Sequence, residues 1–125
     1  MIKETKILIF ANSSWYLYNF WLNNLFIFKS LGYKVILMSN DDGFGSLLKD
    51  KGFDFHPLNV SRGVNGIFGD ARLIFKLKNI IRDVNPSIVH NLNPKPVLYG
   101  SILSLTNQLL SKKKQIMVIN SFPGL

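Results

Sequence analysis

The chain has 125 residues, of which 47% are hydrophobic, so it holds enough apolar material for one core and too little for two. It has no cysteine, which excludes a disulfide framework and thiolate metal sites and fits a reducing compartment. Lysine and arginine number 15 against 7 aspartate and glutamate, giving a formal net charge of +8. This balance favours anionic partners such as phosphates, nucleic acid or an anionic membrane face.

The first stretch of the chain reads as a buried strand, a polar turn and a helix. Ile7 to Ala11 is an apolar run of strand length, Asn12 to Ser14 offer helix-capping oxygens, and the helix is predicted to continue to Leu31. No charged residue falls between Lys6 and Lys29, as in a membrane span. The asparagines and serines inside this run would each need a partner in hydrocarbon, so we expect no span. No small-residue cleavage site follows, so we expect no signal peptide either.

The same succession of strand, turn and helix repeats along the rest of the chain. Further strands are predicted at Lys34–Ser39, Phe53–Leu58, Ser87–His90 and Gln115–Asn120, and helices at Ser46–Lys51, Ile67–Val84 and Val97–Leu110. Because Phe53–Leu58 contains a proline, which cannot donate to a sheet, it is predicted to lie at an edge. In Ile67–Val84, apolar residues recur every three or four positions, so one face of this helix is predicted to be buried.

Strands that alternate with helices require right-handed crossovers and a parallel sheet covered on both faces. The sequence therefore predicts an α/β fold, a Rossmann-like three-layer domain over residues 1–125 with about five parallel strands. The expected strand order is 3-2-1-4-5, with a topological switch between the first and fourth strands. Ligands bind at such a switch, beyond the carboxyl ends of the strands. The segments expected there are Asn12–Trp15 and Asn91–Lys95, flanked by Asn40–Asp42 and Ser121–Gly124.

Several common site types are not supported by the sequence. The turn after the first strand contains no glycine, so dinucleotide binding is not expected. Asp41 and Asp42 follow the second strand, whereas the acidic pair of receiver domains follows the first, so they are predicted to cap the short helix after them. No cysteine, carboxylate or second histidine stands at metal-ligand spacing from His90, and neither a metal nor a cofactor is predicted. For His90 a core role and a ligand contact both stay open.

Two further features leave alternatives open. The first helix carries more aromatic surface than one buried face needs, so it packs against the sheet and a neighbouring element, or part of it meets lipid or a second domain. Lys95 stands in the turn before the fourth predicted helix, where free backbone N–H groups and the helix dipole favour an anion. Lys95 is therefore a candidate phosphate contact or a solvated surface lysine.

Three segments together resemble one protein family. They are SSWYLYNF after the first strand, the pattern VHxxxPKPxxYG from Val89 to Gly100, and NSFPGL after the fifth strand. They are similar to the amino-terminal half of retaining, GT-B-type bacterial glycosyltransferases with a glycosyltransferase 4-like domain, close to those that extend undecaprenyl-diphosphate-linked sugars. The resemblance spans the whole chain.

The resemblance implies an acceptor-binding domain of an enzyme whose second domain binds the nucleotide-sugar donor. It implies a lipid-linked or polysaccharide acceptor, a cytoplasmic protein at the inner face of the cell membrane, and no activity of this chain alone. The chain stops within its last motif, so we expect a truncated product or a fragment. Leu92 and Trp21 replace a histidine and an arginine of relatives, and those contacts are not carried over. The residues that match the pattern, and are expected to line the cleft, are Ser14, Trp15, Tyr18, Asn19, His90, Pro94, Lys95, Tyr99 and Gly124.

Two alternatives accompany this reading. The chain could be a separate subunit that docks on a donor-binding chain. It could also be a basic nucleic-acid-binding module, but no element carries clustered arginine and lysine interleaved with exposed aromatics, so no nucleic acid partner is expected.

Overall fold

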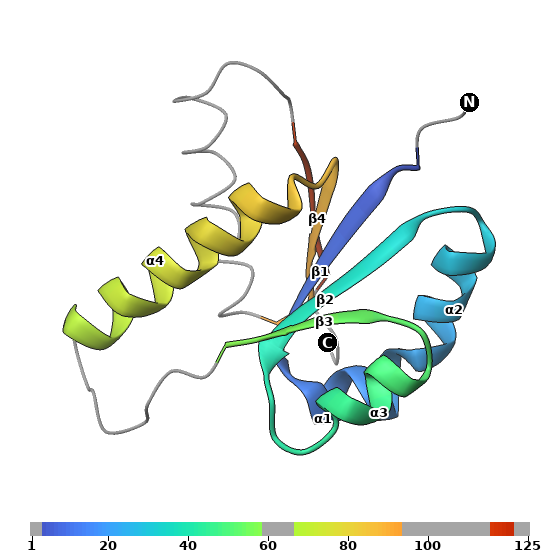
Figure 1. The fold of residues 1–125 in the computed structure, drawn as a ribbon, viewed down its shortest axis with the longest axis horizontal. Helices are drawn as coiled ribbons and strands as arrows, with labels where there is room; N and C mark the ends of the chain where they lie inside the picture. Colours follow the sequence, from blue (N-terminus) through green and yellow to red (C-terminus); the bar gives the residue numbers. More distant parts are fainter. Residues whose placement is uncertain (1–3, 59–66, 94–115, 122–125) are drawn as a thin grey trace.

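The computed structural model describes residues 4–58, 67–93 and 116–121 of the chain (Figure 1). Every strand and helix that the sequence predicts within these ranges is present, with bounds shifted by a few residues. The elements are β1 (Lys6–Ser13), α1 (Ser14–Tyr16), a π-helical turn η1 (Leu17–Trp21), α2 (Leu22–Ser30), β2 (Lys34–Asn40), α3 (Gly45–Asp50), β3 (Asp54–Pro57), α4 (Ile67–Val84), β4 (Ile88–Asn91) and β5 (Met117–Asn120). The predicted helix Val97–Leu110 lies outside the described residues.

The sheet has the predicted topology. Its five strands follow the order β3-β2-β1-β4-β5, and every neighbouring pair is parallel. β1 therefore lies between β2 and β4, with Ile9 opposite Leu37 on one side and His90 on the other. The proline-bearing β3 lies at one edge, as predicted. The predicted Rossmann-like fold and the switch point between β1 and β4 are confirmed.

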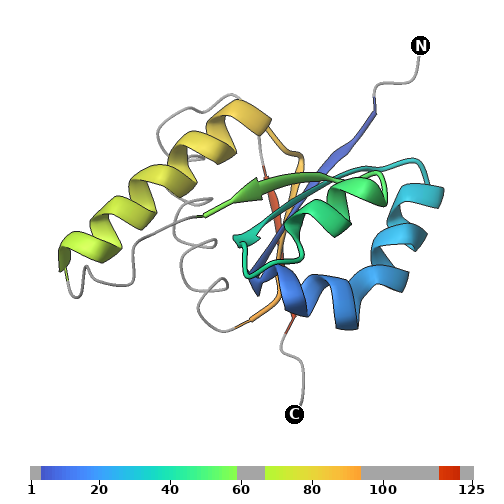
Figure 2. The same ribbon diagram turned by 60° about the horizontal axis from the view of Figure 1, so that its bottom comes forward.

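Helices cover the sheet on both faces and form three layers (Figures 1 and 2). Alternate residues of a strand point to opposite faces, so Ile7 and Ile9 of β1 join the core beneath α1 to α3, while Leu8 and Phe10 join the core beneath α4. In α4, Leu77, Ile81 and Val84 are buried as predicted. Ile74, which the three- and four-residue spacing places on the same face, is 36% exposed.

The first helix differs from the prediction of one continuous α-helix. It is interrupted by η1, in which the backbone N–H groups bond to carbonyls five residues earlier instead of four. The chain leaves α2 as expected: Gly32 has φ +97°, and its N–H donates to the carbonyl of Lys29 at 3.1 Å. No helix among the described residues is long and apolar enough to cross a membrane.

Candidate functional site

Uncharged amide side chains join the carboxyl ends of the central strands. The N–H of Asn12 donates to Oδ1 of Asn93 at 3.0 Å, across the switch point between β1 and β4. One strand further, Nδ2 of Asn91 donates to Oδ1 of Asn120 at 3.1 Å, and the N–H of Ser121 donates to the carbonyl of Asn91 at 2.9 Å. We call Asn12, Asn91, Asn93, Asn120 and Ser121 the switch-point rim. Asn91 and Asn93 are buried and hold the strand ends together, whereas Asn12 and Asn120 are exposed and Ser121 is half-buried. These last three offer neutral hydrogen-bonding groups where ligands bind in this fold.

Ser14 joins the start of the first helix to the loop after β2. Its side chain is fully buried, and its hydroxyl accepts hydrogen bonds from the N–H groups of Asp42 (3.1 Å) and Phe44 (3.2 Å). The same hydroxyl donates to the carboxylate of Asp42 at 2.5 Å. Its hydrogen-bonding capacity is therefore used within the protein. The structure gives Ser14 a structural role, and its predicted ligand contact stays a prediction.

The two aspartates cap different helices, which corrects the prediction that both cap α3. Asp41 accepts from the N–H groups of Gly43 and Gly45 at 3.1 and 3.0 Å, so it does cap α3. Asp42 instead accepts from the N–H of Trp15 at 2.9 Å and so caps the first helix. The backbone N–H groups of Gly45 and Gly43 lower the pKa of the Asp41 carboxyl, because they stabilise its ionised form.

The other predicted site residues of the first helix lie in or next to the π-helical turn η1. Nδ2 of Asn19 donates to the carbonyl of Trp15 at 2.9 Å, where the backbone pattern changes. The Tyr18 ring packs against Phe44, with 5.4 Å between centroids. Trp15 is 45% exposed. Trp15 and Asn19 therefore present surface to a ligand, while Tyr18 is half-buried beside the loop that Ser14 fastens.

His90 lies beneath the first helix rather than at the surface of the rim. It is 7% exposed, and its ring meets the edge of Trp21 at 5.3 Å between centroids. Nε2 of His90 lies 2.7 Å from Oγ of Ser121, and buried Nδ1 has no hydrogen-bond partner within the described part of the chain. Burial lowers the pKa of His90, so the ring is neutral near pH 7. His90 thus fixes the position of the Ser121 hydroxyl from the buried side of the switch-point rim.

The structure brings together some of the predicted site residues. Ser14, Trp15, Tyr18 and Asn19 follow one another along the first helix, and His90 reaches the same layer from β4. Pro94, Lys95, Tyr99 and Gly124 lie outside the described residues. Sequence reasoning missed Asn120 and the contact between Trp21 and His90. The parallel pairing of Asn91 with Asn120 is the signal that could have found Asn120.

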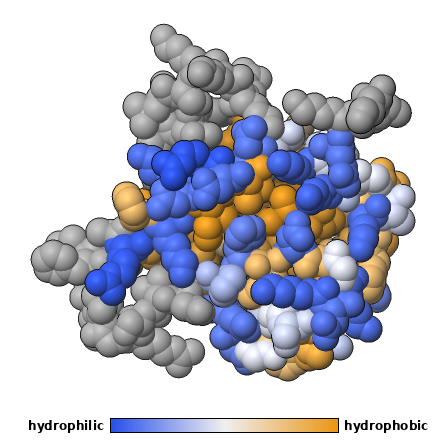
Figure 3. Space-filling view, in the orientation of Figure 1, coloured by the Kyte–Doolittle hydropathy of each residue, from blue (hydrophilic) through white to orange (hydrophobic). Residues whose placement is uncertain are grey.

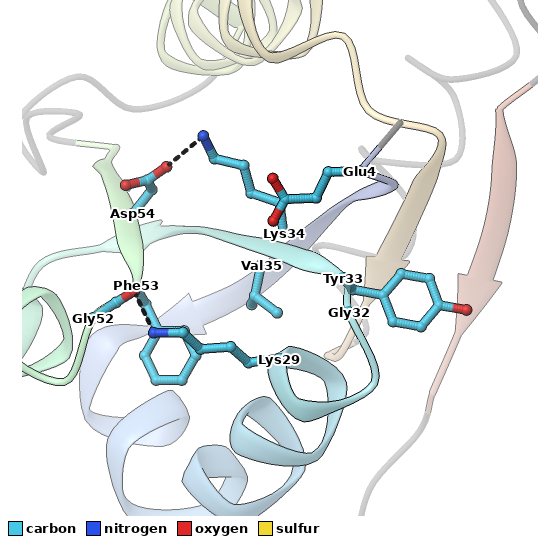
Figure 4. A pocket seen from close by; sticks show the side chains of 9 residues that line it. All are labelled: Glu4, Lys29, Gly32, Tyr33, Lys34, Val35, Gly52, Phe53 and Asp54. Carbon is cyan, nitrogen blue, oxygen red and sulfur yellow. Dashed lines mark hydrogen bonds and ion pairs between the residues drawn. The ribbon is translucent and has the colours of Figure 1, made fainter. Parts of the chain in front are cut away.

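A pocket of about 400 Å³ lies at the opposite end of the sheet, beside the first residues of β2 and β3 (Figure 4). Its cations are already paired: Nζ of Lys29 donates to the carbonyl of Gly52 at 3.1 Å and lies 5.4 Å from the centre of the Phe53 ring. Lys34 lies 3.8 Å from the carboxylate of Asp54, and Tyr33 points away from both lysines. These contacts join α2 and the start of β2 to the start of β3.

Comparison with known proteins agrees with this architecture. The crystal structure of MurG from Acinetobacter baumannii matches 94% of this chain with a TM-score of 0.63, at 16% sequence identity. The chain spans 35% of that MurG chain, and the fold is one Rossmann-like half of a GT-B fold. No curated protein matches the chain. A family model described as glycosyl transferase 4-like matches residues 6–124. Because that match covers nearly the whole chain, the protein belongs to the glycosyl transferase 4-like family.

Proposed function

We propose that the chain is the acceptor-binding half of a glycosyltransferase, which transfers a sugar from a nucleotide-sugar to a lipid-linked or polysaccharide acceptor. Family membership supports glycosyl transfer. The observation that carries the acceptor assignment is the switch-point rim, where carboxamides and a serine lie at the ligand-binding end of the sheet. Amides and hydroxyls can both donate to and accept from sugar hydroxyls.

The turn after β1 does not favour binding of the nucleotide-sugar donor by this half of the enzyme. A nucleotide diphosphate needs close backbone approach or cations, but Asn12, Ser13 and Ser14 include no glycine. The described residues that directly follow the carboxyl ends of the strands include no lysine or arginine, and Asp41 and Asp42 add negative charge, against which only Lys49 of α3 acts on Asp41 among the described groups. The donor is therefore assigned to a second domain or a separate chain. For the diphosphate of a lipid-linked acceptor, Lys95 remains the predicted contact.

Within the full enzyme, this half would bind and orient the acceptor. The rim would hold the sugar that carries the attacking hydroxyl, and the donor-binding half would stabilise the departing nucleotide diphosphate. Electrostatic stabilisation of that leaving group is a large part of the rate enhancement in such reactions. We therefore expect the chain alone to transfer no sugar.

A peripheral position at the inner face of the cell membrane fits the charge distribution. On the exposed side of α4, Arg72 and Lys78 lie about one turn on either side of Phe75, which is 66% exposed. Arg82 lies two turns from Phe75, and its side chain is 3.7 Å from the carboxylate of Asp83. Figure 3 shows hydrophilic surface along α4. Basic residues around an exposed aromatic suit an anionic lipid surface. Sedimentation with vesicles of phosphatidylglycerol and phosphatidylcholine tests this, and equal binding of the wild type and Arg82→Glu would contradict it.

Calorimetry with one acceptor analogue and two nucleotide-sugars tests whether this half binds the acceptor or the donor. We expect a short-chain prenyl-diphosphate-linked disaccharide to bind the chain and UDP-glucose and UDP-N-acetylglucosamine not to bind. The same mixture should yield no transfer product. Binding of a nucleotide-sugar without binding of the acceptor would reverse the assignment, and a transfer product made by this chain alone would show that the second half is dispensable.

A further inference from the structure

The π-helical turn η1 changes which side chains of the first helix are neighbours. In a regular α-helix, residues five apart point about 140° away from each other. In η1 the wider turn brings such residues to one side. The rings of Trp15 and Phe20 accordingly meet edge to face, with 5.2 Å between centroids, and the Tyr16 ring lies 5.5 Å from Phe20.

The aromatic pair stays open to solvent and has amides beside it. Trp15 is 45% and Phe20 is 61% exposed; Phe26, farther along the helix, is 40% exposed but packs beside Phe53, and Tyr18 packs beside Phe44. Asn23 and Asn24, at the start of α2, follow Phe20 by three and four residues in the chain, and both are exposed. Neither side chain forms a hydrogen bond with any described part of the chain. We call Trp15, Asn19, Phe20, Asn23 and Asn24 the aromatic–amide patch.

The chemistry of this patch matches a saccharide. A sugar ring has an apolar C–H face, which an exposed aromatic ring can cover, and a rim of hydroxyls that an amide meets with one acceptor and two donors. The patch has no charge, because no charged residue occurs between Lys6 and Lys29. A hydrocarbon occupant would bury the unpaired amides at a cost. An anionic membrane would meet Asp42, which lies against the start of this helix.

The patch begins where the candidate acceptor site ends. Figure 2 shows the first helix leaving the carboxyl end of β1, and the backbone N–H of Trp15 is held in the network of Ser14 and Asp42. We propose that the aromatic–amide patch binds the sugar chain of the acceptor and so extends the switch-point rim outward along the first helix. This inference rests on the proposed function for the identity of its ligand.

Two-dimensional NMR of the full chain with neutral trisaccharides tests the patch residue by residue. Maltotriose and triacetylchitotriose are suitable probes. We expect them to shift the indole N–H of Trp15 and the side-chain amides of Asn23 and Asn24. The indole N–H of Trp21, which is half-buried against His90, should stay in place.

Matched variants distinguish specific binding at the patch from nonspecific binding to exposed aromatic rings. Phe20→Ala should weaken trisaccharide binding about two- to tenfold, as expected for loss of one aromatic contact. Phe75→Ala, which removes a comparably exposed ring from α4, should leave binding unchanged. Asn24→Leu provides a second variant at an exposed position, with a similar expected loss. Equal losses in Phe20→Ala and Phe75→Ala would overturn the proposal.

Other outcomes distinguish this inference from the proposed function. Chemical-shift changes at Asn93 and Ser121 without changes in the aromatic–amide patch would support the switch-point rim as the acceptor site and would show that the patch does not bind the saccharide. Chemical-shift changes in the patch without any at the rim would support saccharide binding by the patch and contradict the assignment of the rim as the acceptor site. Shifts of Ile27 and Leu31 by farnesyl diphosphate, with no response to either trisaccharide, would identify a hydrocarbon contact and overturn the saccharide assignment.

Discussion

Replacing Ser14 with alanine should destabilise the protein more than any other serine substitution among the described residues. The hydroxyl lies in a fully buried side chain and joins three groups of the loop after β2. Alanine removes a charge-assisted bond to the Asp42 carboxylate and leaves the N–H groups of Asp42 and Phe44 without their acceptor. A charge-assisted bond contributes about 1.5–3 kcal/mol, and a buried donor left unpaired costs about 1–3 kcal/mol.

Solvent reduces this sum, because Asp42 itself is exposed and water can replace part of what is lost. We therefore expect Ser14→Ala to lower the free energy of unfolding by about 2–4 kcal/mol, measured by urea denaturation. Ser13→Ala is the matched control: within the part of the chain that the structure describes, the Ser13 hydroxyl accepts only the N–H of Tyr16, at 3.1 Å, and loss of such a cap costs about 1 kcal/mol. Ser46→Ala, at an exposed position, should cost almost nothing. If Ser14→Ala costs no more than Ser13→Ala, the network does not fasten the loop to the helix.

Three further predictions concern pH, a glycine and a lysine. The folded protein holds His90 neutral with a lowered pKa, so the unfolded chain binds more protons below its pKa of about 6.5. The free energy of unfolding should therefore stay constant with respect to His90 above that pH and fall as the pH drops below it. His90→Gln should make this fall less steep. An unchanged slope in the variant would show that His90 does not cause the pH dependence. Gly52 has φ +96°, so Gly52→Ala should destabilise by about 1–2 kcal/mol through the backbone alone. A Cβ there would lie 2.5 Å from Nζ of Lys29, the end of a flexible and exposed side chain that can move aside, so only a small additional loss is expected, and it should disappear in the Lys29→Ala background. An equal cost in both backgrounds would show that Lys29 does not contribute. Lys95→Ala should weaken binding of a prenyl-diphosphate-linked acceptor roughly ten- to a hundredfold, whereas Lys113→Ala should not; equal small losses would mean general charge attraction.

The strand order could be predicted because it depends on features that a single sequence displays. Apolar runs such as Lys34–Ser39, the proline in β3 and the alternation of strands with helices allow few topologies. Gly32 marked the end of the first helix correctly, since its positive φ is a local requirement. Local signals of this kind act over a few residues and are visible without the fold.

The π-helical turn could not be predicted for the opposite reason. Leu17 to Trp21 contain neither proline nor glycine, and the helix is apolar on nearly every side, so no periodicity shows where its register changes. The contact between Trp15 and Phe20 depends on this turn and was hidden with it. A cluster of aromatic residues could be seen in the sequence, but not which rings stay exposed.

The positions of site residues were predicted better than their surroundings. His90 was placed at the carboxyl end of β4, where it is, but its burial beneath Trp21 depends on packing between distant segments. Asp42 was expected to cap the helix that follows it and instead caps the helix of the neighbouring strand. The two loops meet because β1 and β2 are parallel neighbours, so topology must be known before caps of this kind can be assigned.

The most direct test of the acceptor assignment is to map, on the backbone amides of the chain, where a short prenyl-diphosphate-linked disaccharide binds. We predict shifts at Asn12, Asn93 and Ser121, on both sides of the switch point, and none at the opposite end of the sheet. Shifts confined to the pocket beside Val35, Gly52 and Phe53 would contradict the assignment. Shifts at the rim with a nucleotide-sugar, and none with the acceptor, would contradict it as well.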